Sequence, residues 1–513
     1  MLAKVYSCAL LGIEGIPLEI EVDLSGGLPA FELIGLPDPA VREARERVRS
    51  AIKNSGFEFP LRRITVNLAP ADLKKEGTGF DLAIAVGILV ATGQIPQNEL
   101  LKSTVLVGEL SLEGTLRPVP GALAIAASVA SNRQLRGYTI CLPEINSTEA
   151  ALISAVTVIG IRSLKQLTSY LCHEINLPVV KPSIEKLLEP PITNLDFSEV
   201  RGQETAKRAL EVAAAGAHNI LLYGPPGSGK TMLARRLPTI LPSPALDEML
   251  EITRIHSVAG CLAPHQPLVT CRPFRTPHHS ASAAGIIGGG KIPRPGEVSL
   301  AHRGVLFLDE LPEYNRNILE ALRQPLEDRR VTVTRVSASL TYPCDFMLVA
   351  SMNPCPCGNF GDPIRECRCS PSIIQRYRSR LSGPLLDRID IQIEVPRVKY
   401  DQLEKDRPIE RSPAIRNRVK RARQRQEERF KNLKILTNSQ MSSRQTVDFC
   451  PLSSEAKDLL RRSYQQLGLS MRAHDRLLKV ARTIADLEGA ETIKLNHIAE
   501  AIQYRSLDRQ PEI

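Results

Sequence analysis

The sequence predicts an α/β protein built on a parallel sheet between helices, with an α+β domain before it and a helical domain after it. Three observations predict this class. An apolar run at Ile220–Leu222 leads through a glycine-rich turn into a helix. A second apolar run, Val305–Leu308, ends in two acidic residues, as expected for a strand buried on both faces. The first 170 residues contain strands with alternating apolar and polar side chains.

The length of 513 residues is too great for one hydrophobic core and predicts several domains. We expect an α+β domain at 1–170, a proline-containing linker at 171–196, the sheet core at 197–400 and a helical domain at 401–513. The first domain is expected to have these strands and helices: strands Ile16–Leu24, Arg62–Pro70, Ser103–Leu112 and Gly137–Pro143, and helices Asp38–Ser55, Phe80–Thr92 and Gly121–Ser131.

Composition narrows the class of protein. Hydrophobic residues make up 43% and charged residues 24% of the chain, which is ordinary for a globular protein. The chain has no apolar stretch of membrane-spanning length and no apolar segment of the signal-peptide type near its start, so we expect a cytoplasmic protein without a membrane partner. There the eleven cysteines would be thiols or metal ligands. The net charge of +10 favours polyanionic partners only where the charge is local.

The segment NILLYGPPGSGKT (219–231) has the spacing and the strand-to-helix context of a phosphate-binding loop. Its nucleotide-binding residues are expected to be Gly224, Pro225, Pro226, Gly227, Ser228, Gly229, Lys230 and Thr231. The glycines let successive backbone N–H groups turn toward an anion. Lys230 would reach the β- and γ-phosphates, and Thr231 would bind Mg²⁺. ATP and Mg²⁺ are therefore the expected cofactors.

Two later strands end in residues suited to hydrolysis. After Val305–Leu308 come Asp309, which would hold the Mg²⁺ and its water shell, and Glu310, which would polarise the attacking water. The strand in DFMLVASMNP ends at Asn353, whose neutral amide suits a hydrogen bond to the γ-phosphate or the water. A strand-end asparagine that only caps a turn is the alternative for Asn353.

The order of these segments resembles an AAA+ ATPase module. The resemblance implies that Arg388, in LLDRID, is an arginine finger that completes a neighbour's site, so the protein would form a ring. An ion pair with Asp387 or Asp390 is the alternative. Arg472 lies where the sensor-2 arginine of the family reaches the nucleotide; a solvated charge at a helix start is its alternative.

Before the core, the segment FSEVRGQE resembles the entry to the AAA+ nucleotide pocket and makes Val200, Gly202 and Gln203 candidates for contact with adenine. Between the two acidic residues and Asn353, the alternation in RVTVTRVSASLTYP predicts a β-hairpin with Arg335 and Ser337 near its tip. It resembles the pre-sensor-1 hairpin that lines the pore in the Mg chelatase and minichromosome maintenance helicase branch. Arg335 would then contact DNA phosphates; a hairpin that touches only protein is the alternative.

Other segments of the core carry weaker signals. Glycine and proline in residues 286–304 predict an irregular insertion loop. Four cysteines follow Asn353 with C-x-C spacing and could converge on a structural Zn²⁺ or pack as reduced thiols: Cys355, Cys357, Cys367 and Cys369. The strongly basic stretch Arg407–Lys431 predicts a helix from Ser412 onward that either contacts DNA phosphates or is simply solvated.

The segments KKEGTGFDLAIAVGIL and GELSLEGTLRPVPGAL resemble the active-site segments of the Lon-type protease domain. Gly79 stands where that family has its nucleophilic serine, and Leu123 where it has its lysine. Neither side chain supports nucleophilic or proton-transfer chemistry. We therefore expect a Lon-like fold without peptidase activity, whose protein partner is unknown.

Three phrases, TPHHSAS, NPCPCG and LSGPLLDRID, together with this domain order, resemble the Mg chelatase-like AAA+ ATPase family that includes competence proteins, over nearly the whole chain. The resemblance implies a homo-hexameric ATPase that binds single-stranded or branched DNA and drives branch migration, a helicase-type activity, in recombination during natural transformation. The alternatives are a Mg chelatase-type motor subunit and an AAA+ protein-remodelling factor.

Overall fold

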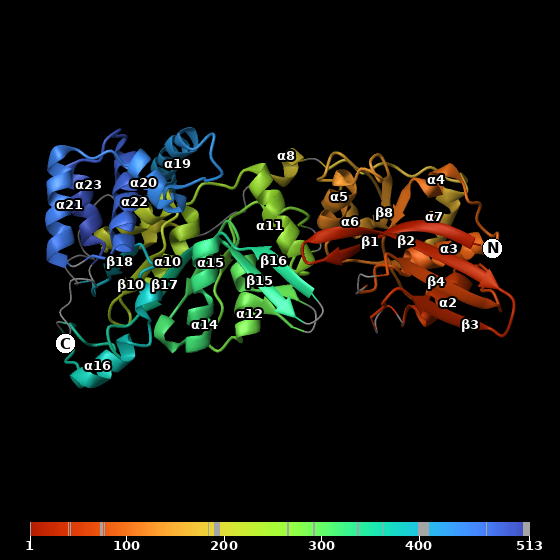
Figure 1. Ribbon diagram of the computed structural model, residues 1–513, viewed down its shortest axis with the longest axis horizontal. Coiled ribbons are helices and arrows are strands. Elements are labelled where there is room, and N and C mark those ends of the chain that lie inside the picture. The colour runs from red at the N-terminus through yellow and green to blue at the C-terminus, as the bar shows by residue number, and fades with distance from the viewer. Residues whose placement is uncertain are drawn as a thin grey trace. The chain divides into compact units, whose positions relative to one another are not determined.

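The computed structural model describes residues 2–505 except 39, 40, 42, 72–74, 76, 183, 189–194, 264, 265, 291, 292, 336, 337, 363, 399–409 and 468. The chain divides into two compact units. Unit 1 comprises Met1–Pro190, Ala245–Thr270 and Thr334–Tyr342; unit 2 comprises Pro191–Pro244, Cys271–Val333 and Pro343–Ile513. Each unit combines a sheet with helices (Figure 1), which confirms the α/β class predicted from sequence.

Unit 1 has a seven-stranded sheet in the order β3-β4-β2-β1-β5-β8-β9. Its strands are β1 (Leu2–Leu11), β2 (Glu14–Ser25), β3 (Ala30–Ile34), β4 (Arg63–Ala69), β5 (Thr104–Leu106), β8 (Thr139–Pro143) and β9 (Thr157–Ile161). Its main helices are α2 (Ala44–Asn54), α3 (Asp81–Ala91), α5 (Ala122–Ser131), α6 (Glu144–Ala150), α7 (Leu164–Leu171) and α11 (Leu246–Val258). Neighbouring residues of a strand point to opposite faces. Val5 of β1 therefore packs with α2 and α3, whereas Cys8 packs with α5, and helices cover both faces.

One expectation for unit 1 is corrected. The strand expected at Ser103–Leu112 ends at Leu106, and β6 (Glu109–Leu110) pairs with β7 (Leu116–Arg117) in a separate sheet. The chain leaves the large sheet because the N–H and C=O of Gly108 bond to backbone groups at the start of α3. Within the linker expected at 171–196, a helical turn, α8 (Ile184–Leu187), forms.

Helix α11 comes from the middle of the chain, yet it packs against α5 in unit 1. Leu123 of α5 is buried and shares a small hydrophobic cluster with Met249 of α11 and Leu268. Beside it, the buried Glu149 carboxylate accepts hydrogen bonds from Leu123 N, at 2.8 Å, and from the Ser257 hydroxyl. Burial raises the pKa of Glu149. Segment 245–270 therefore joins unit 1 through both apolar and polar contacts.

Unit 2 is built on a parallel five-stranded sheet in the order β11-β14-β17-β10-β18. The strands are β11 (Phe274–Arg275), β14 (Val305–Leu308), β17 (Met347–Met352), β10 (Ile220–Tyr223) and β18 (Ile391–Glu394). β10, β14 and β17 are buried along their whole length, which explains their unbroken apolar sequences. Since parallel strands end at the same edge, the segments that follow β10, β14 and β17 meet there.

The insertion at 286–304 was expected to be irregular, and this is wrong in part. It contains the end of α12 (Ala283–Ile287), the strands β12 (Gly288–Gly289) and β13 (Arg294–Pro295), and the helix α13 (Glu297–Leu300). Gly288 and Gly296 lie so close together that a β-carbon on Gly296 would stand 2.3 Å from Gly288 N. The glycines therefore permit a tight strand pair instead of a loop.

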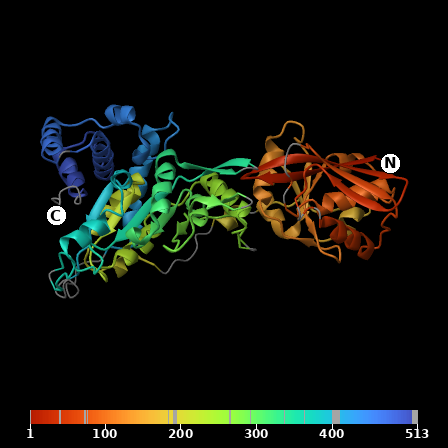
Figure 2. The ribbon, with the colours of Figure 1, turned by 60° about the horizontal axis from the view of Figure 1, so that its bottom comes forward.

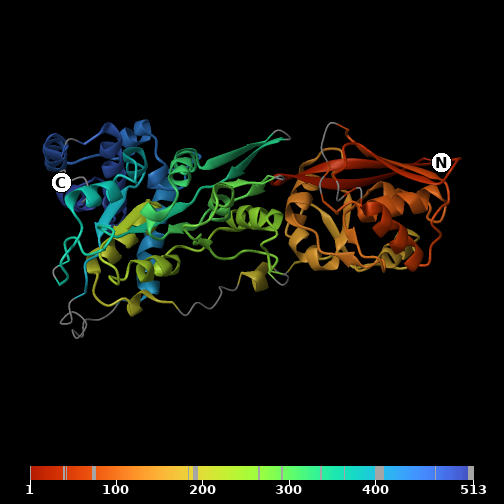
Figure 3. The same ribbon diagram turned by 90° about the horizontal axis from the view of Figure 1, so that it is seen from below.

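The expected hairpin forms from β15 (Arg330–Arg335) and β16 (Ala338–Pro343), two long paired strands in Figure 3. Arg335 is the last residue of β15. Its side chain and residue 337 lie outside the described part of the chain.

The C-terminal helices, blue in Figure 2, share one hydrophobic core with the sheet of unit 2. The C-terminal helices are α19 (Ser412–Arg429), α20 (Ser443–Phe449), α21 (Ser454–Leu467), α22 (Met471–Glu488) and α23 (Leu495–Gln503), and α9 (Glu204–Gly216) packs against α19 and α22. Several arginines of the basic helix α19 bond to protein groups: Arg416 to Thr239 O, Arg418 to Glu211 and Glu410, Arg423 to Ala214 O, and Arg429 to Asp486. These arginine side chains therefore anchor α19 to the neighbouring protein segments. Residues 407–409 of the basic stretch lie outside the described part.

Candidate functional site

The phosphate-binding loop joins β10 to α10 (Lys230–Arg236). Gly224, Gly227 and Gly229 all have positive φ, at 158°, 77° and 93°. At Gly224 a β-carbon would stand 2.2 Å from Val395 O, at the end of the neighbouring strand β18, whereas at Gly227 it would meet no atom within 4 Å. Gly224 is therefore required by close packing as well as by its backbone conformation.

Lys230 is buried beneath this loop. Its Nζ donates hydrogen bonds to Gly224 O at 2.7 Å, to Pro225 O at 2.9 Å and to Asn353 Oδ1 at 3.3 Å. Burial lowers the pKa of Lys230 to about 8, although the carboxylates of Asp309 and Glu310 oppose the shift. The loop and the end of β17 are thus linked through one ammonium group.

The two residues expected to hold Mg²⁺ are in direct contact. Thr231 Oγ1 donates to Asp309 Oδ2 at 2.9 Å, and Asp309 Oδ1 accepts from the Ser351 hydroxyl of β17. A hydroxyl and a carboxylate are oxygen ligands of the kind that Mg²⁺ prefers. The pair therefore fits the metal, and Ser351, which no sequence pattern singled out, orients Asp309.

Glu310 follows Asp309 in a left-handed conformation with φ of 53°. Its backbone N–H donates to Ser351 Oγ at 3.1 Å, and its side chain is exposed. Such a conformation is unfavourable for a residue with a β-carbon and is typical of functional sites. The backbone turn separates the exposed Glu310 carboxylate from the half-buried Thr231–Asp309 pair.

Gln203 lies beside the phosphate-binding loop. It precedes α9 with φ of 59°, and its side-chain Nε2 donates to Ser228 O at 3.2 Å and also to Pro396 O. Of the other two residues expected near adenine, Val200 is buried and Gly202 has φ of 65°.

The arginine expected to act on a neighbouring subunit, Arg388, pairs with an acid that no sequence pattern singled out. Arg388 forms an ion pair with Glu327 of α15 (Arg323–Asp328) and donates to Pro384 O at 2.7 Å. The pair with Arg388 lowers the pKa of Glu327, and the charge of Arg472 contributes to the shift. The alternative partner Asp390 is instead paired with Arg476, at 3.4 Å. Arg472 itself is exposed in the first turn of α22.

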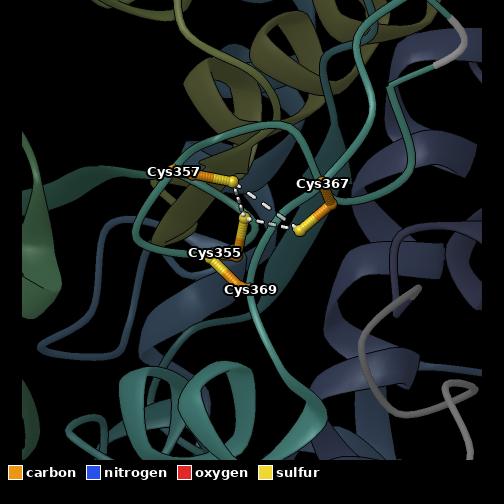
Figure 4. Close-up of side chains that lie close together, drawn as sticks. All are labelled: Cys355, Cys357, Cys367 and Cys369. Carbon is orange, nitrogen blue, oxygen red and sulfur yellow. Dashed lines mark hydrogen bonds between the residues drawn. The ribbon is translucent and has the colours of Figure 1, made fainter.

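The four cysteines after β17 converge. They are Cys355, Cys357, Cys367 and Cys369, and their Sγ atoms all lie within 4.8 Å of one another. Figure 4 shows three of the sulfur atoms pointing toward one another. Backbone N–H groups of Asn359 and Arg368 lower the pKa of Cys357 to about 6, which favours its thiolate.

The two positions compared with the Lon dyad are occupied by residues without a nucleophilic or basic group. Gly79 immediately precedes the first turn of α3, where a β-carbon would have only Val107 Cγ1 near it, at 3.8 Å. Leu123, 1% exposed, is buried beside α11. Room for a nucleophile therefore exists at Gly79, but the position of the base is filled by the packing of α11.

Three family models match the chain. Residues 196–403 match magnesium chelatase, subunit ChlI; residues 20–146 match subunit ChlI of Mg-chelatase; and residues 409–505 match the C-terminal part of magnesium chelatase subunit ChlI. Among the described residues, no helix has the length and apolar character needed to cross a membrane.

Full-length relatives were also found. The chain is 44% identical to YifB of Escherichia coli K12 over 511 residues, which cover 99% of this chain and 98% of that protein. It is 45% identical to competence protein ComM of Haemophilus influenzae Rd over 516 residues, with 99% and 98% covered. It is also 30% identical to Lon protease 2 of Bacillus subtilis 168 over 155 residues, 29% of this chain and 28% of that protein.

Proposed function

The chain belongs to the Mg chelatase-like AAA+ family of YifB and ComM, and on that premise we propose that it is an ATP-hydrolysing motor that forms a hexameric ring and acts on DNA. The observation that supports hydrolysis most is the meeting of four groups at one sheet edge. The Lys230 ammonium contacts the Asn353 amide, and the Thr231 hydroxyl contacts the Asp309 carboxylate.

Each residue has a distinct task in this proposal. Lys230 and the loop N–H groups bind the phosphates, and Thr231 and Asp309 hold Mg²⁺, which neutralises charge on the phosphate oxygens. The Glu310 carboxylate orients a water and accepts its proton. The Asn353 amide donates a hydrogen bond to the γ-phosphate or the water and does not compete for the proton.

Two arginines, Arg388 and Arg472, have proposed roles toward a neighbouring subunit and toward the chain's own nucleotide. Arg388 would leave Glu327 and complete the site of a neighbouring subunit, where a planar guanidinium pairs well with phosphate oxygens. Arg472 would act on the nucleotide bound to its own chain. Glu327 would hold Arg388 within its own chain until the guanidinium moves to the neighbour.

DNA is proposed as the substrate because a full-length relative is a competence protein and because the hairpin carries Arg335 at the end of β15. The preferred forms are single-stranded or branched DNA, and the activity is branch migration or unwinding.

We propose the domain limits 1–170, 171–196, 197–400 and 401–513. We also propose a cytoplasmic location, since eleven cysteines favour a reducing compartment.

A magnesium chelatase motor subunit is the second candidate, because all three matching models describe subunit ChlI.

Steady-state ATPase rates distinguish the DNA motor from the chelatase subunit. We would compare no polymer, single-stranded DNA and a four-way junction at low and high salt, since phosphate contacts weaken with salt. The DNA motor predicts stimulation that is lost at high salt and in Arg335→Ala, but kept in Arg133→Ala, which removes an exposed charge outside the hairpin and the basic stretch. Normal basal turnover without any stimulation would favour the chelatase or a protein-remodelling function.

A further inference from the structure

The four-cysteine cluster (Cys355, Cys357, Cys367 and Cys369) has the dimensions of a metal site. The Sγ atom of Cys355 lies 3.3 Å from that of Cys357 and 3.7 Å from that of Cys367, and the third distance, Cys357 to Cys367, is 3.6 Å. A tetrahedral Zn²⁺ with Zn–S bonds of about 2.3 Å sets its sulfurs about 3.8 Å apart. A disulfide would require about 2.05 Å. The observed spacing therefore fits a shared metal ion better than sulfur–sulfur bonds.

Outside the cluster, the loop is held by side-chain contacts that include an ion pair between Asp362 and Arg397 at 2.9 Å and the Arg378 guanidinium over the Phe360 ring. Cys355 is fully buried, whereas Cys357 is exposed and Ile364 is 73% exposed. The backbone N–H of Phe360 donates to Cys355 Sγ at 3.4 Å, an arrangement that stabilises a metal-bound thiolate. The buried Cys355 sulfur with its N–H donor, rather than apolar packing of the loop, favours the metal-bound form.

The same loop adjoins two parts of the phosphate site, Asn353 at the end of β17 and Pro226 in the phosphate-binding loop. It begins two residues after Asn353, whose amide accepts a hydrogen bond from Lys230. Farther along, Gly358 has φ of 79°, and a β-carbon there would stand 2.5 Å from Pro226 Cδ in the phosphate-binding loop. The backbone of Gly358 is tied to Cys355 by an N–H···O bond of 3.0 Å. The cluster thus fixes the segment that touches Pro226.

We propose that the four-cysteine cluster binds one structural Zn²⁺, and that the resulting knuckle holds Gly358 against Pro226, so that loss of the metal weakens nucleotide binding. The second part rests on the proposed nucleotide site; the first does not.

Metal content tests the first part. The full chain, purified under reducing conditions and supplied with zinc, should retain about one zinc per chain, as measured by mass spectrometry. Cys357→Ser and the double variant Cys367→Ser/Cys369→Ser should lose most of it. Cys261→Ser, which removes an exposed thiol outside the cluster, should keep it. Cobalt substitution should give the intense visible absorption of a tetrahedral thiolate site. A wild-type zinc content near zero, or equal content in all variants, would overturn the site.

Affinity for fluorescent ADP, measured before and after chelation, tests the second part. We expect affinity to fall roughly tenfold on zinc removal and to recover when zinc is restored, because small displacements of a binding group are costly. Zinc removal with unchanged affinity would overturn the coupling. A zinc-loaded chain that binds no nucleotide would refute the proposed function while leaving the metal site intact.

Discussion

Thr231 and Asp309, 78 residues apart in the chain, are joined by a hydrogen bond of 2.9 Å between a hydroxyl and a carboxylate. The bond exists because β10 and β14 end at the same edge of a parallel sheet, with β17 between them. Ser351 fixes the second oxygen of Asp309. The two candidate Mg²⁺ ligands therefore lie together at the sheet edge, and the proposed hydrolysis depends on the groups near them.

Among these neighbouring groups, the Glu310 carboxylate is the proposed acceptor of the proton from the attacking water. Replacing Glu310 with Gln removes the proton acceptor and keeps the size of the side chain. We expect ATP affinity to be unchanged and kcat to fall roughly 100-fold or more. Equilibrium binding of labelled ATP and steady-state phosphate release measure the two quantities. Normal turnover in this variant would rule out Glu310 as the base.

The lowered pKa of Lys230 predicts a pH dependence of nucleotide binding. Its pKa of about 8 means that the free protein loses this positive charge as pH rises through that value. Phosphate binds the charged form, so affinity for ADP should fall as pH rises above about 8, by up to about tenfold per unit. Lys230→Arg keeps its charge and should show a flatter profile. Equal slopes for the two proteins between about pH 7 and pH 9 would contradict this assignment.

Two glycines of the phosphate-binding loop provide a matched pair. Both have positive φ, but only Gly224 faces a close neighbour, Val395 O. We expect Gly224→Ala to lower the free energy of unfolding by about 1–3 kcal/mol more than Gly227→Ala does. Denaturant unfolding of the two variants gives this difference. Equal losses would mean that backbone strain alone, and not the contact with β18, makes Gly224 necessary.

The buried packing of Leu123 predicts that introducing the lysine of the Lon dyad at this position lowers the stability of the fold. Leu123→Lys places a charge in the cluster with Met249 and should destabilise the protein by roughly 3 kcal/mol. Leu123→Met, of similar volume, should cost about 1 kcal/mol or less. Gly79→Ser should be tolerated, since the nearest atom to its β-carbon is 3.8 Å away. Thermal unfolding is the measurement, and a lysine variant as stable as the methionine variant would refute the assignment.

Mixing two inactive variants tests whether Arg388 completes the ATPase site of a neighbouring subunit or acts within its own chain. Arg388→Ala and Lys230→Ala should each be nearly inactive alone. If they are mixed, some interfaces combine an intact phosphate-binding loop with an intact arginine, and part of the ATPase activity should return. A mixture no more active than its components would place the action of Arg388 within its own chain, in keeping with its pairing to Glu327.

The elements that the sequence predicted well are those in which one local pattern determines the structure. The unbroken apolar runs at β10, β14 and β17 and the glycine spacing of the loop are of this kind. The sequence could not reveal the contacts of Glu327 or Ser351, because their partners come from distant segments. Nor could it show that α11 joins unit 1 or that arginines of α19 bind protein groups, since both depend on tertiary packing.

The central claim, that this AAA+ chain moves DNA strands at the cost of ATP, is tested most directly with a fluorescently labelled four-way junction. Strand separation would be followed in real time with the wild-type chain, with Glu310→Gln and without ATP. The proposal predicts that only the wild-type chain with ATP converts the junction into its product duplexes. If the wild-type chain hydrolyses ATP at a normal rate and the junction stays intact, the DNA motor is contradicted.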